Sequence, residues 1–122
     1  MSHVDVITRL AASVRDAGAA ATLAYLRRTR PAMLGVDGEV IPYHDTIAVF
    51  TVWAVHRLVA AGLSDVQIIW HPLTDVRTPL AWWDEDTLCS DAAYAAFVPS
   101  TKALPGDPAP YEPFEPFSPL AA

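Results

Sequence analysis

Apolar residues recur at helical spacing near the N-terminus of the chain. Val4, Ile7, Leu10, Ala11 and Val14 fall on one face of a helix. Ser2 and Asp5 resemble a capping box at its start, and Gly18 is typical of the residue that follows a helix C-terminus. The pattern therefore predicts a first helix over residues 3–17.

A second segment, residues 46–61, is apolar on nearly every face. Its large apolar residues are Ile47, Val49, Phe50, Val52, Trp53, Val55, Leu58 and Val59. A helix that is apolar all round is buried all round, so we predict a core helix here. The longest apolar stretch, residues 47–63, has about the minimum length of a membrane span, but His56 and Arg57 interrupt it. We therefore expect no membrane-spanning segment.

Each of these two segments is followed by a glycine and then a short apolar stretch. Residues 19–28 combine an alanine run, which suits a helix, with Leu23 and Tyr25, which suit a strand. Residues 66–70 are typical of a buried strand. This shared order of helix, glycine and short apolar stretch is either a weak repeat or chance. Taken together, the two stretches favour a strand over residues 19–28 as well as over residues 66–70. A third short strand is expected over residues 38–43, at a sheet edge because it contains a proline.

A third helix is predicted from Asp84 or Asp86, either of which can cap it, to Phe97. Together the patterns predict an α+β or small α/β fold, with about three helices, a short sheet and an extended proline-rich C-terminal tail. The expected organisation is one globular domain over residues 1–98 and a polyproline II tail over residues 99–122.

Composition places the chain among ordinary folded domains. Of its 122 residues, 52% are hydrophobic and 18% are charged, which excludes disorder for most of the chain. The single cysteine excludes an internal disulfide, and the N-terminus lacks a basic and apolar signal segment, so we expect a cytoplasmic protein. The excess of alanine and proline suggests a bacterial genome rich in GC.

The charges are divided along the chain. The first 35 residues hold five arginines against two aspartates, a net charge of +3. Because the whole chain has a net charge of −6, the remaining residues carry −9. The arginines at positions 27, 28 and 30 can contact phosphate or, more simply, the acidic remainder of the fold. Because nucleic-acid-binding domains are usually basic, we do not expect nucleic acid as a partner.

Two histidine–aspartate pairs are the candidate catalytic residues. His44 and Asp45 precede the core helix, and His71 and Asp75 follow the apolar stretch at 66–70. If both ends lie on one side of the fold, the four side chains form a site for general acid–base catalysis or for a divalent metal. Asp45 fits equally well as the N-cap of the helix, and the structural interpretation is the one we favour.

The sequence contains no motif that implies a cofactor. A glycine-rich phosphate loop and a serine nucleophile elbow are both missing, and histidine spacings typical of metal sites do not occur. Cys89 lies among acidic residues, which raise the pKa of a thiol and weaken it as a nucleophile. We therefore predict neither a cofactor nor a metal.

The proline-rich tail has a three-residue repeat. Its aromatic stripe consists of Tyr111, Phe114, Phe117 and Leu120. Prolines form a second row and the acidic Glu112 and Glu115 belong to a third, as a polyproline II helix with three residues per turn would arrange them. Because an exposed aromatic stripe favours aggregation, we expect it to dock on its own domain, on a sister subunit or on a foreign partner.

The lack of catalytic motifs and the apolar composition favour a non-enzymatic partner-binding or accessory protein, of an immunity, phage or complex-subunit type. Its expected binding elements are Trp82, Trp83 and the aromatic stripe, and self-association as a homodimer is the simplest assembly. The alternative is a small-molecule enzyme or binding protein with a pocket near His44 and His71. A closed polar pocket favours this alternative, and a flat aromatic patch favours partner binding.

Replacing both Phe114 and Phe117 by Ala distinguishes the three docking modes of the tail. If the stripe docks on its own domain, the free energy of unfolding falls by a few kcal/mol, since a buried Phe truncation costs about 3–5 kcal/mol and partial exposure reduces this. Docking on a sister subunit instead makes the variant dissociate, with a concentration-dependent melting temperature. Urea unfolding measures the loss of stability, and light scattering at two protein concentrations measures the dissociation. If neither stability nor mass changes, docking on the same domain and docking on a sister subunit are both contradicted.

Overall fold

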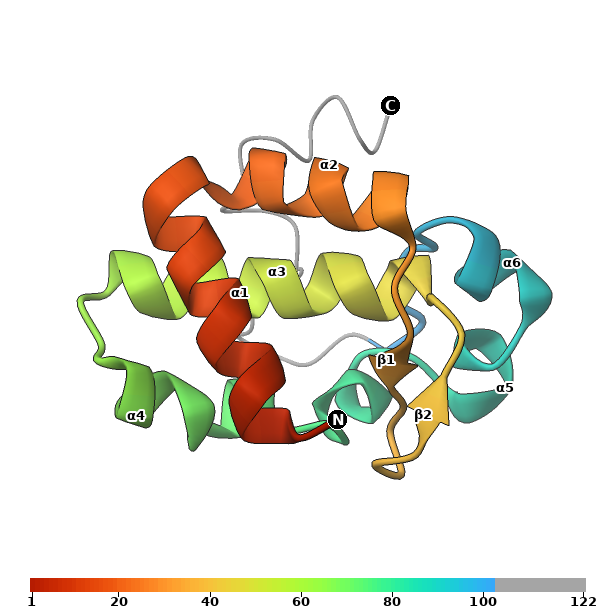
Figure 1. The fold of residues 1–122 in the computed structure, drawn as a ribbon. Coiled ribbons are helices and arrows are strands. Elements are labelled where there is room, and N and C mark those ends of the chain that lie inside the picture. The colour runs from red at the N-terminus through yellow and green to blue at the C-terminus, as the bar shows by residue number, and fades with distance from the viewer. Residues whose placement is uncertain (103–122) are drawn as a thin grey trace.

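The computed structural model describes residues 1–102 and shows a mostly helical fold around one central helix (Figure 1). The helices are α1 (His3–Ala17), α2 (Ala19–Thr29), α3 (Asp45–Ala60), α4 (Asp65–Ile69), α5 (Glu85–Leu88) and α6 (Asp91–Ala95). Two 3-10 turns, η1 (Pro72–Thr74) and η2 (Thr78–Ala81), lie between α4 and α5. Strands β1 (Met33–Leu34) and β2 (Val40–Ile41) form a two-stranded antiparallel sheet in which Met33 pairs with Ile41. The predicted aromatic stripe lies outside the described residues.

The predicted core helix is present as α3. Eleven of its sixteen residues are buried. Figure 1 shows α1 crossing in front of it, α2 above it, α4 below one end, and α5 and α6 beside the other end. Phe50 and Trp53 pack with Trp82 and Trp83 in an aromatic cluster. Within the described residues, no helix is long and apolar enough to cross a membrane.

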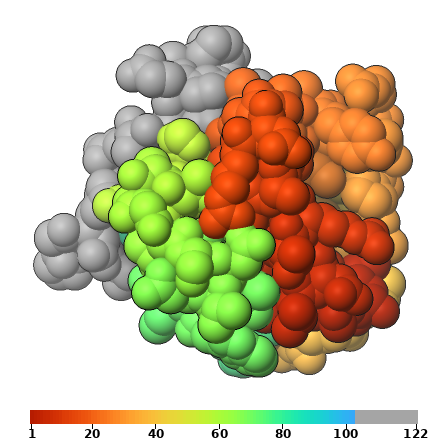
Figure 2. All heavy atoms as spheres, turned by 60° about the vertical axis from the view of Figure 1, so that its left-hand side comes forward, coloured from red at the N-terminus to blue at the C-terminus, as the bar shows by residue number. Residues whose placement is uncertain are grey.

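The first helix begins and ends where the sequence predicts. The Ser2 hydroxyl accepts a hydrogen bond from the backbone N–H of Asp5, and Gly18 closes the helix with a φ of +89°, which favours glycine. Figure 2 shows α1 running between α4 on one side and α2 on the other. Arg15 of α1 connects this helix to α4, because it forms an ion pair with Asp65 and donates to the Leu63 carbonyl.

The strand predicted for residues 19–28 is wrong, because this segment forms the helix α2. The alanine run favours a helix, and burial of Ala19, Thr22 and Leu23 follows helical spacing. The helix ends at Thr29. The next residue, Arg30, has left-handed backbone angles (φ 46°, ψ 56°) and is followed by a proline that cannot continue the helix.

The second predicted strand is also a helix, α4. Ser64 and Gln67 form a complete capping box at its start, a signal that was present in the sequence. In a strand, Val66, Ile68 and Trp70 would share one face. The helix separates them: Ile68 is fully buried, whereas Val66 is 66% exposed and Trp70 is 71% exposed.

The third predicted helix is divided into α5 and α6. Asp84 caps α5 by accepting from the Thr87 N–H, as the sequence suggests. Ser90 then caps α6 by accepting from the Ala93 N–H, so that a new helix begins where one continuous helix was expected. The result is six helices within the described residues, rather than about three.

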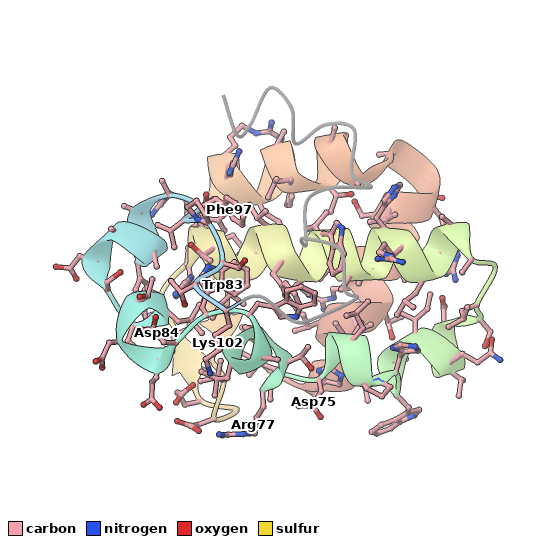
Figure 3. All side chains as sticks on the ribbon, turned by 180° about the vertical axis from the view of Figure 1, so that it is seen from behind. Asp75, Arg77, Trp83, Asp84, Phe97 and Lys102 are labelled. Carbon is pink, nitrogen blue, oxygen red and sulfur yellow. The ribbon has the colours of Figure 1, made fainter. Side chains whose placement is uncertain are left out.

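After α6 the chain returns to the aromatic cluster, on the side shown in Figure 3. The Trp83 indole N–H donates to the Val98 carbonyl at 2.9 Å, and the Phe97 ring packs edge-on against Trp83. The backbone N–H groups of Thr101 and Lys102 both point to the Trp82 carbonyl, each at 2.9 Å. The chain is therefore attached to the domain as far as Lys102.

A pair of substitutions tests the placement of α4. Ile68→Ala removes a fully buried side chain and should reduce the free energy of unfolding by about 2–5 kcal/mol. Val66→Ala changes an exposed side chain two residues away and should cost no more than about 0.5 kcal/mol. Urea denaturation measures both values, and equal losses would indicate that the two side chains share one buried face, as in a strand.

Candidate functional site

An apolar pocket of about 590 Å³ lies in the fold, bounded by α1, α2, β1 and α3. In Figure 1, α1, α2 and β1 surround the part of α3 that forms the floor. Leu10, Leu26 and Met33 belong to the walls, and Ile47 and Phe50 to the floor. Its volume is within the range of about 300–1,000 Å³ that is usual for small-molecule sites.

The two helical walls of the pocket result from the turn at Gly18. This glycine reverses the chain between α1 and α2, so that one face of each helix lines the pocket. Val6 and Leu10 are one turn apart on α1, and Leu26 and Thr29 are nearly one turn apart on α2. The walls diverge from a fixed corner, where the Ser13 and Thr22 hydroxyls bond each other at 2.6 Å.

The buried and half-buried threonine hydroxyls of the pocket are already hydrogen-bonded within the chain. Thr22 donates to the Gly18 carbonyl at 2.9 Å, Thr51 to the Ile47 carbonyl at 2.7 Å, and Thr74 to the Ile68 carbonyl at 2.6 Å. Charged side chains of the lining, such as Asp5 and Arg9, are on exposed residues. The interior therefore offers apolar surface and few unsatisfied polar groups to a bound molecule.

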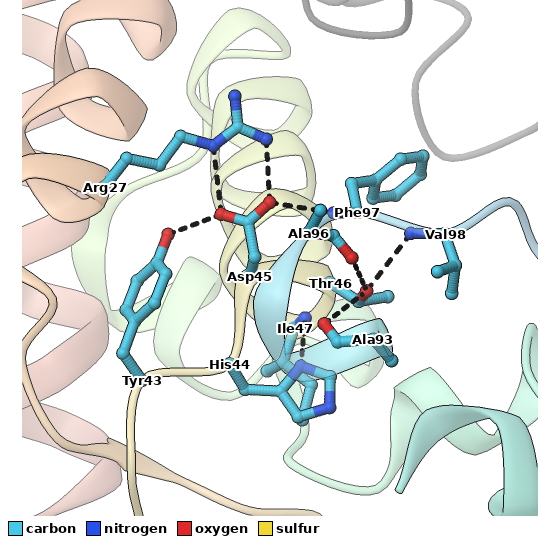
Figure 4. Close-up of polar contacts among 10 residues, drawn as sticks. All are labelled: Arg27, Tyr43, His44, Asp45, Thr46, Ile47, Ala93, Ala96, Phe97 and Val98. Carbon is cyan, nitrogen blue, oxygen red and sulfur yellow. Dashed lines mark hydrogen bonds and ion pairs between the residues drawn. The ribbon is translucent and has the colours of Figure 1, made fainter. Parts of the chain in front are cut away.

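Asp45 is the centre of a buried hydrogen-bond network at the start of α3 (Figure 4). Arg27 of α2 binds both carboxylate oxygens, with Nε–Oδ1 of 2.9 Å and Nη2–Oδ2 of 2.8 Å. The Tyr43 hydroxyl donates to Oδ1 at 2.8 Å, and the Phe97 backbone N–H donates to Oδ2 at 2.9 Å. The hydrogen bond to Asp45 raises the pKa of Arg27. The pKa of Tyr43 is raised mainly by desolvation and, to a smaller extent, by its hydrogen bond to Asp45.

Neighbouring Thr46 extends this network toward the C-terminal segment. Its hydroxyl oxygen lies 2.9 Å from the Ala93 carbonyl and 3.2 Å from the Ala96 carbonyl, and accepts from the Val98 N–H at 3.2 Å. The start of α3 is thus bonded to α2 through Asp45 and to the end of α6 through Thr46.

His44, rather than Asp45, is the N-cap of α3, which corrects the sequence-based assignment. Its Nδ1 accepts from the Ile47 N–H at 3.1 Å, so the ring proton is on Nε2, which donates to the Leu88 carbonyl at 2.6 Å. The ring also packs against Tyr94, with a centroid distance of 4.2 Å. Burial lowers the pKa of His44, and both nitrogens of the neutral ring are occupied.

The other two candidate catalytic residues also bond nearby backbone groups. His71 Nδ1 accepts from the Leu73 N–H at 3.0 Å, and Asp75 accepts from the Arg77 N–H at 2.9 Å. Within residues 1–102, no hydrogen bond joins His44 or Asp45 to either of them, and no group of three His, Cys, Asp or Glu side chains could hold a metal ion. Of the four candidates, Asp75 alone lines the apolar pocket.

The predicted partner-binding tryptophans are core residues. Trp82 is 6% exposed and Trp83 is fully buried, so neither presents its ring as an anchor on the described surface. The exposed tryptophan is Trp70, which the strand prediction placed inside the fold. The capping box at Ser64 was the signal for this, because it begins the helix α4, whose C-cap is the exposed Trp70.

The remaining polar candidates agree with the simpler sequence interpretations. Arg27 meets the acidic Asp45 within the fold, and Arg28 and Arg30 stack on tyrosine rings. Partial desolvation and the nearby acidic Glu85 raise the pKa of Cys89. A raised thiol pKa reduces the thiolate fraction and hence the nucleophilicity of this cysteine.

Comparisons with known proteins match the chain to no family model, no curated protein and no solved structure.

The buried His44 makes stability depend on pH in a defined direction. Its folded pKa is lowered, so below the unfolded value of about 6.5 the unfolded chain binds a proton that the folded chain does not. The contribution of neutral, buried His44 to the free energy of unfolding is therefore fully present above about pH 6.5 and is lost as the pH falls below that value. His44→Asn retains an N-cap acceptor and removes the titrating group.

The free energy of unfolding should therefore fall more between about pH 7.5 and about pH 5.5 in the natural chain than in His44→Asn, by about 1 kcal/mol. Urea denaturation at the two pH values measures the difference. The same pH dependence in both proteins would contradict a buried neutral histidine.

Proposed function

We propose that this protein is a non-enzymatic binding protein whose pocket between α1, α2, β1 and α3 holds a small apolar molecule. The observation that carries the proposal is the pocket itself, with a volume of about 590 Å³ and buried or half-buried hydroxyls of Ser13, Thr22, Thr51 and Thr74 that are bonded within the chain. Burial of apolar surface is the main favourable term available to a ligand there, at about 25 cal/mol per Å².

The arrangement of the polar residues supports binding rather than catalysis. A general base needs a free lone pair directed at the substrate. His44 and His71 instead use Nδ1 to accept from backbone N–H groups, and Asp45 is saturated by Arg27, Tyr43 and Phe97. The hydrogen bonds of both candidate catalytic pairs therefore support a structural role.

A second candidate function, protein binding, is supported by the outer face of α4. Val66 and Trp70 are one helical turn apart and are 66% and 71% exposed. Exposed tryptophan is enriched at interaction hot spots, so this face suits a protein partner better than the buried Trp82 and Trp83 do. Self-association as a homodimer stays a prediction.

Isothermal titration calorimetry of the full chain with 1-octanol tests whether the pocket binds an apolar molecule. Thr51→Phe places a ring in the pocket and should weaken binding about tenfold or more, because the ring occupies the apolar space. Thr8→Phe is the matched control: Thr8 bonds its own helix backbone as Thr51 does, at 2.7 Å in both cases, but is outside the pocket. Failure of the natural chain to bind, or equal binding by both variants, would overturn the proposal.

A further inference from the structure

The border of the apolar pocket presents accessible apolar side chains. Tyr25 and Met1 line the pocket and are 55% and 63% exposed. Leu26 and Met33, which also line it, are half-buried. Unlike the buried tryptophans of the aromatic cluster, these side chains leave surface on which a peptide segment can pack.

Two arginines without a carboxylate partner lie at this border. Arg9 of α1 lines the pocket and is exposed, and within residues 1–102 it forms no ion pair. Arg28 of α2 lies over the Tyr25 ring, 5.4 Å from its centroid, and also has no ion pair in that range. Asp5, one turn before Arg9, is the acidic side chain on the α1 side. Each helical wall therefore has a cation available to an acidic segment.

The tail after Lys102 has a composition complementary to this border. It holds three acidic residues and neither lysine nor arginine. Glu112 and Glu115 lie on either side of Phe114, a member of the aromatic stripe. Proline favours the polyproline II conformation, and segments in that conformation dock into grooves lined by aromatic side chains. An apolar pocket bordered by a tyrosine and two arginines matches such a segment in both shape and charge.

The described chain ends close to the pocket. Lys102 Nζ donates to the Leu80 carbonyl at 3.0 Å, and Pro79, the preceding residue of η2, lines the pocket. Phe114 is twelve residues beyond Lys102, which corresponds to about 37 Å in a polyproline II helix at about 3.1 Å per residue. A domain of about 100 residues has a radius of gyration of about 13 Å and is therefore roughly 34 Å across. The stripe can reach the pocket from either side of the domain.

We propose that residues 110–120 bind in the apolar pocket of the same chain and compete there with its ligand. Rings of the aromatic stripe occupy the apolar space, and the tail glutamates face Arg9 and Arg28. A tethered segment is present at an effective concentration in the millimolar range, which favours its own domain over a second molecule. The competition rests on the proposed function of the pocket, whereas the position of the tail can be measured without any ligand.

A spin label in the tail measures that position in the full chain. The label is attached to Ser118→Cys in a Cys89→Ser background, and NMR signals are recorded with the label oxidised and then reduced. The chain has two methionines, Met1 and Met33, and both line the pocket, so the spectrum of ¹³C-methyl methionine reports on it alone. The Met33 methyl signal should lose most of its intensity in the oxidised sample. The ¹⁵N indole signal of Trp70, which does not line the pocket, should lose much less.

Filling the pocket is the matched control for this measurement. Thr51→Phe places a ring in the pocket and should restore the Met33 signal, whereas Thr8→Phe, which is outside the pocket, should not. A mixture of spin-labelled chains with isotope-labelled chains that carry no spin label should show no loss. An unaffected Met33 signal, a loss that Thr51→Phe leaves unchanged, or a loss in the mixture would overturn the proposal.

Isothermal titration calorimetry with 1-octanol measures the competition. Phe114→Ala with Phe117→Ala removes two rings of the stripe and should tighten octanol binding about threefold or more, because the tethered competitor is weakened. Ser118→Ala changes the same segment outside the stripe and should leave the affinity as it is in the natural chain. Equal affinities in the natural chain and the double variant would overturn the proposal. If neither chain binds octanol, the proposed function fails and the competition fails with it, even where the spin label places the tail in the pocket.

Discussion

A carboxylate buried in the first turn of α3 connects three parts of the chain that are far apart in the sequence. Asp45 receives two hydrogen bonds from Arg27 of α2, one from Tyr43 and one from the backbone of Phe97. The helix N-terminus adds a favourable dipole for this charge. Because removal of one member of a buried ion pair costs about 3–5 kcal/mol, the positions of α2 and of the C-terminal segment depend on this contact.

The proposed pocket depends on that arrangement, because Asp45 begins the helix whose side chains form the pocket floor. Ile47, Phe50 and Thr51 of α3 line the pocket, and the Phe50 ring also packs against Trp53 and Trp82 in the aromatic cluster. The Asp45 network holds α2 as a wall of the pocket and Phe97 beside Trp83, so one buried carboxylate positions both the pocket wall and the segment after α6.

The sequence predicted the elements that have strong periodicity and missed those that are short. The first helix and α3 are long enough for their apolar patterns to be unambiguous. The segments that became α2 and α4 are short apolar runs, for which periodicity does not separate helix from strand; the alanine run and the Ser64–Gln67 capping box were the better signals. The pairing of Arg27 with Asp45 and the pocket between α1 and α2 depend on how helices cross, which local patterns do not encode.

A double-mutant cycle between Arg27 and Asp45 tests the central role of this contact most directly. Arg27→Met is expected to lower the free energy of unfolding by about 3 kcal/mol or more, because it leaves the buried Asp45 carboxylate without its cation. Asp45→Asn should cost less, about 2 kcal/mol, because the side chain of Arg27 is 29% exposed and can bind water instead. The double variant should lose much less than the sum, with a coupling energy of about 2 kcal/mol or more. The exposed pair Arg77–Asp37, whose side chains are 62% and 67% exposed, should show a coupling below about 1 kcal/mol. Losses that simply add, within about 0.5 kcal/mol, would contradict the account.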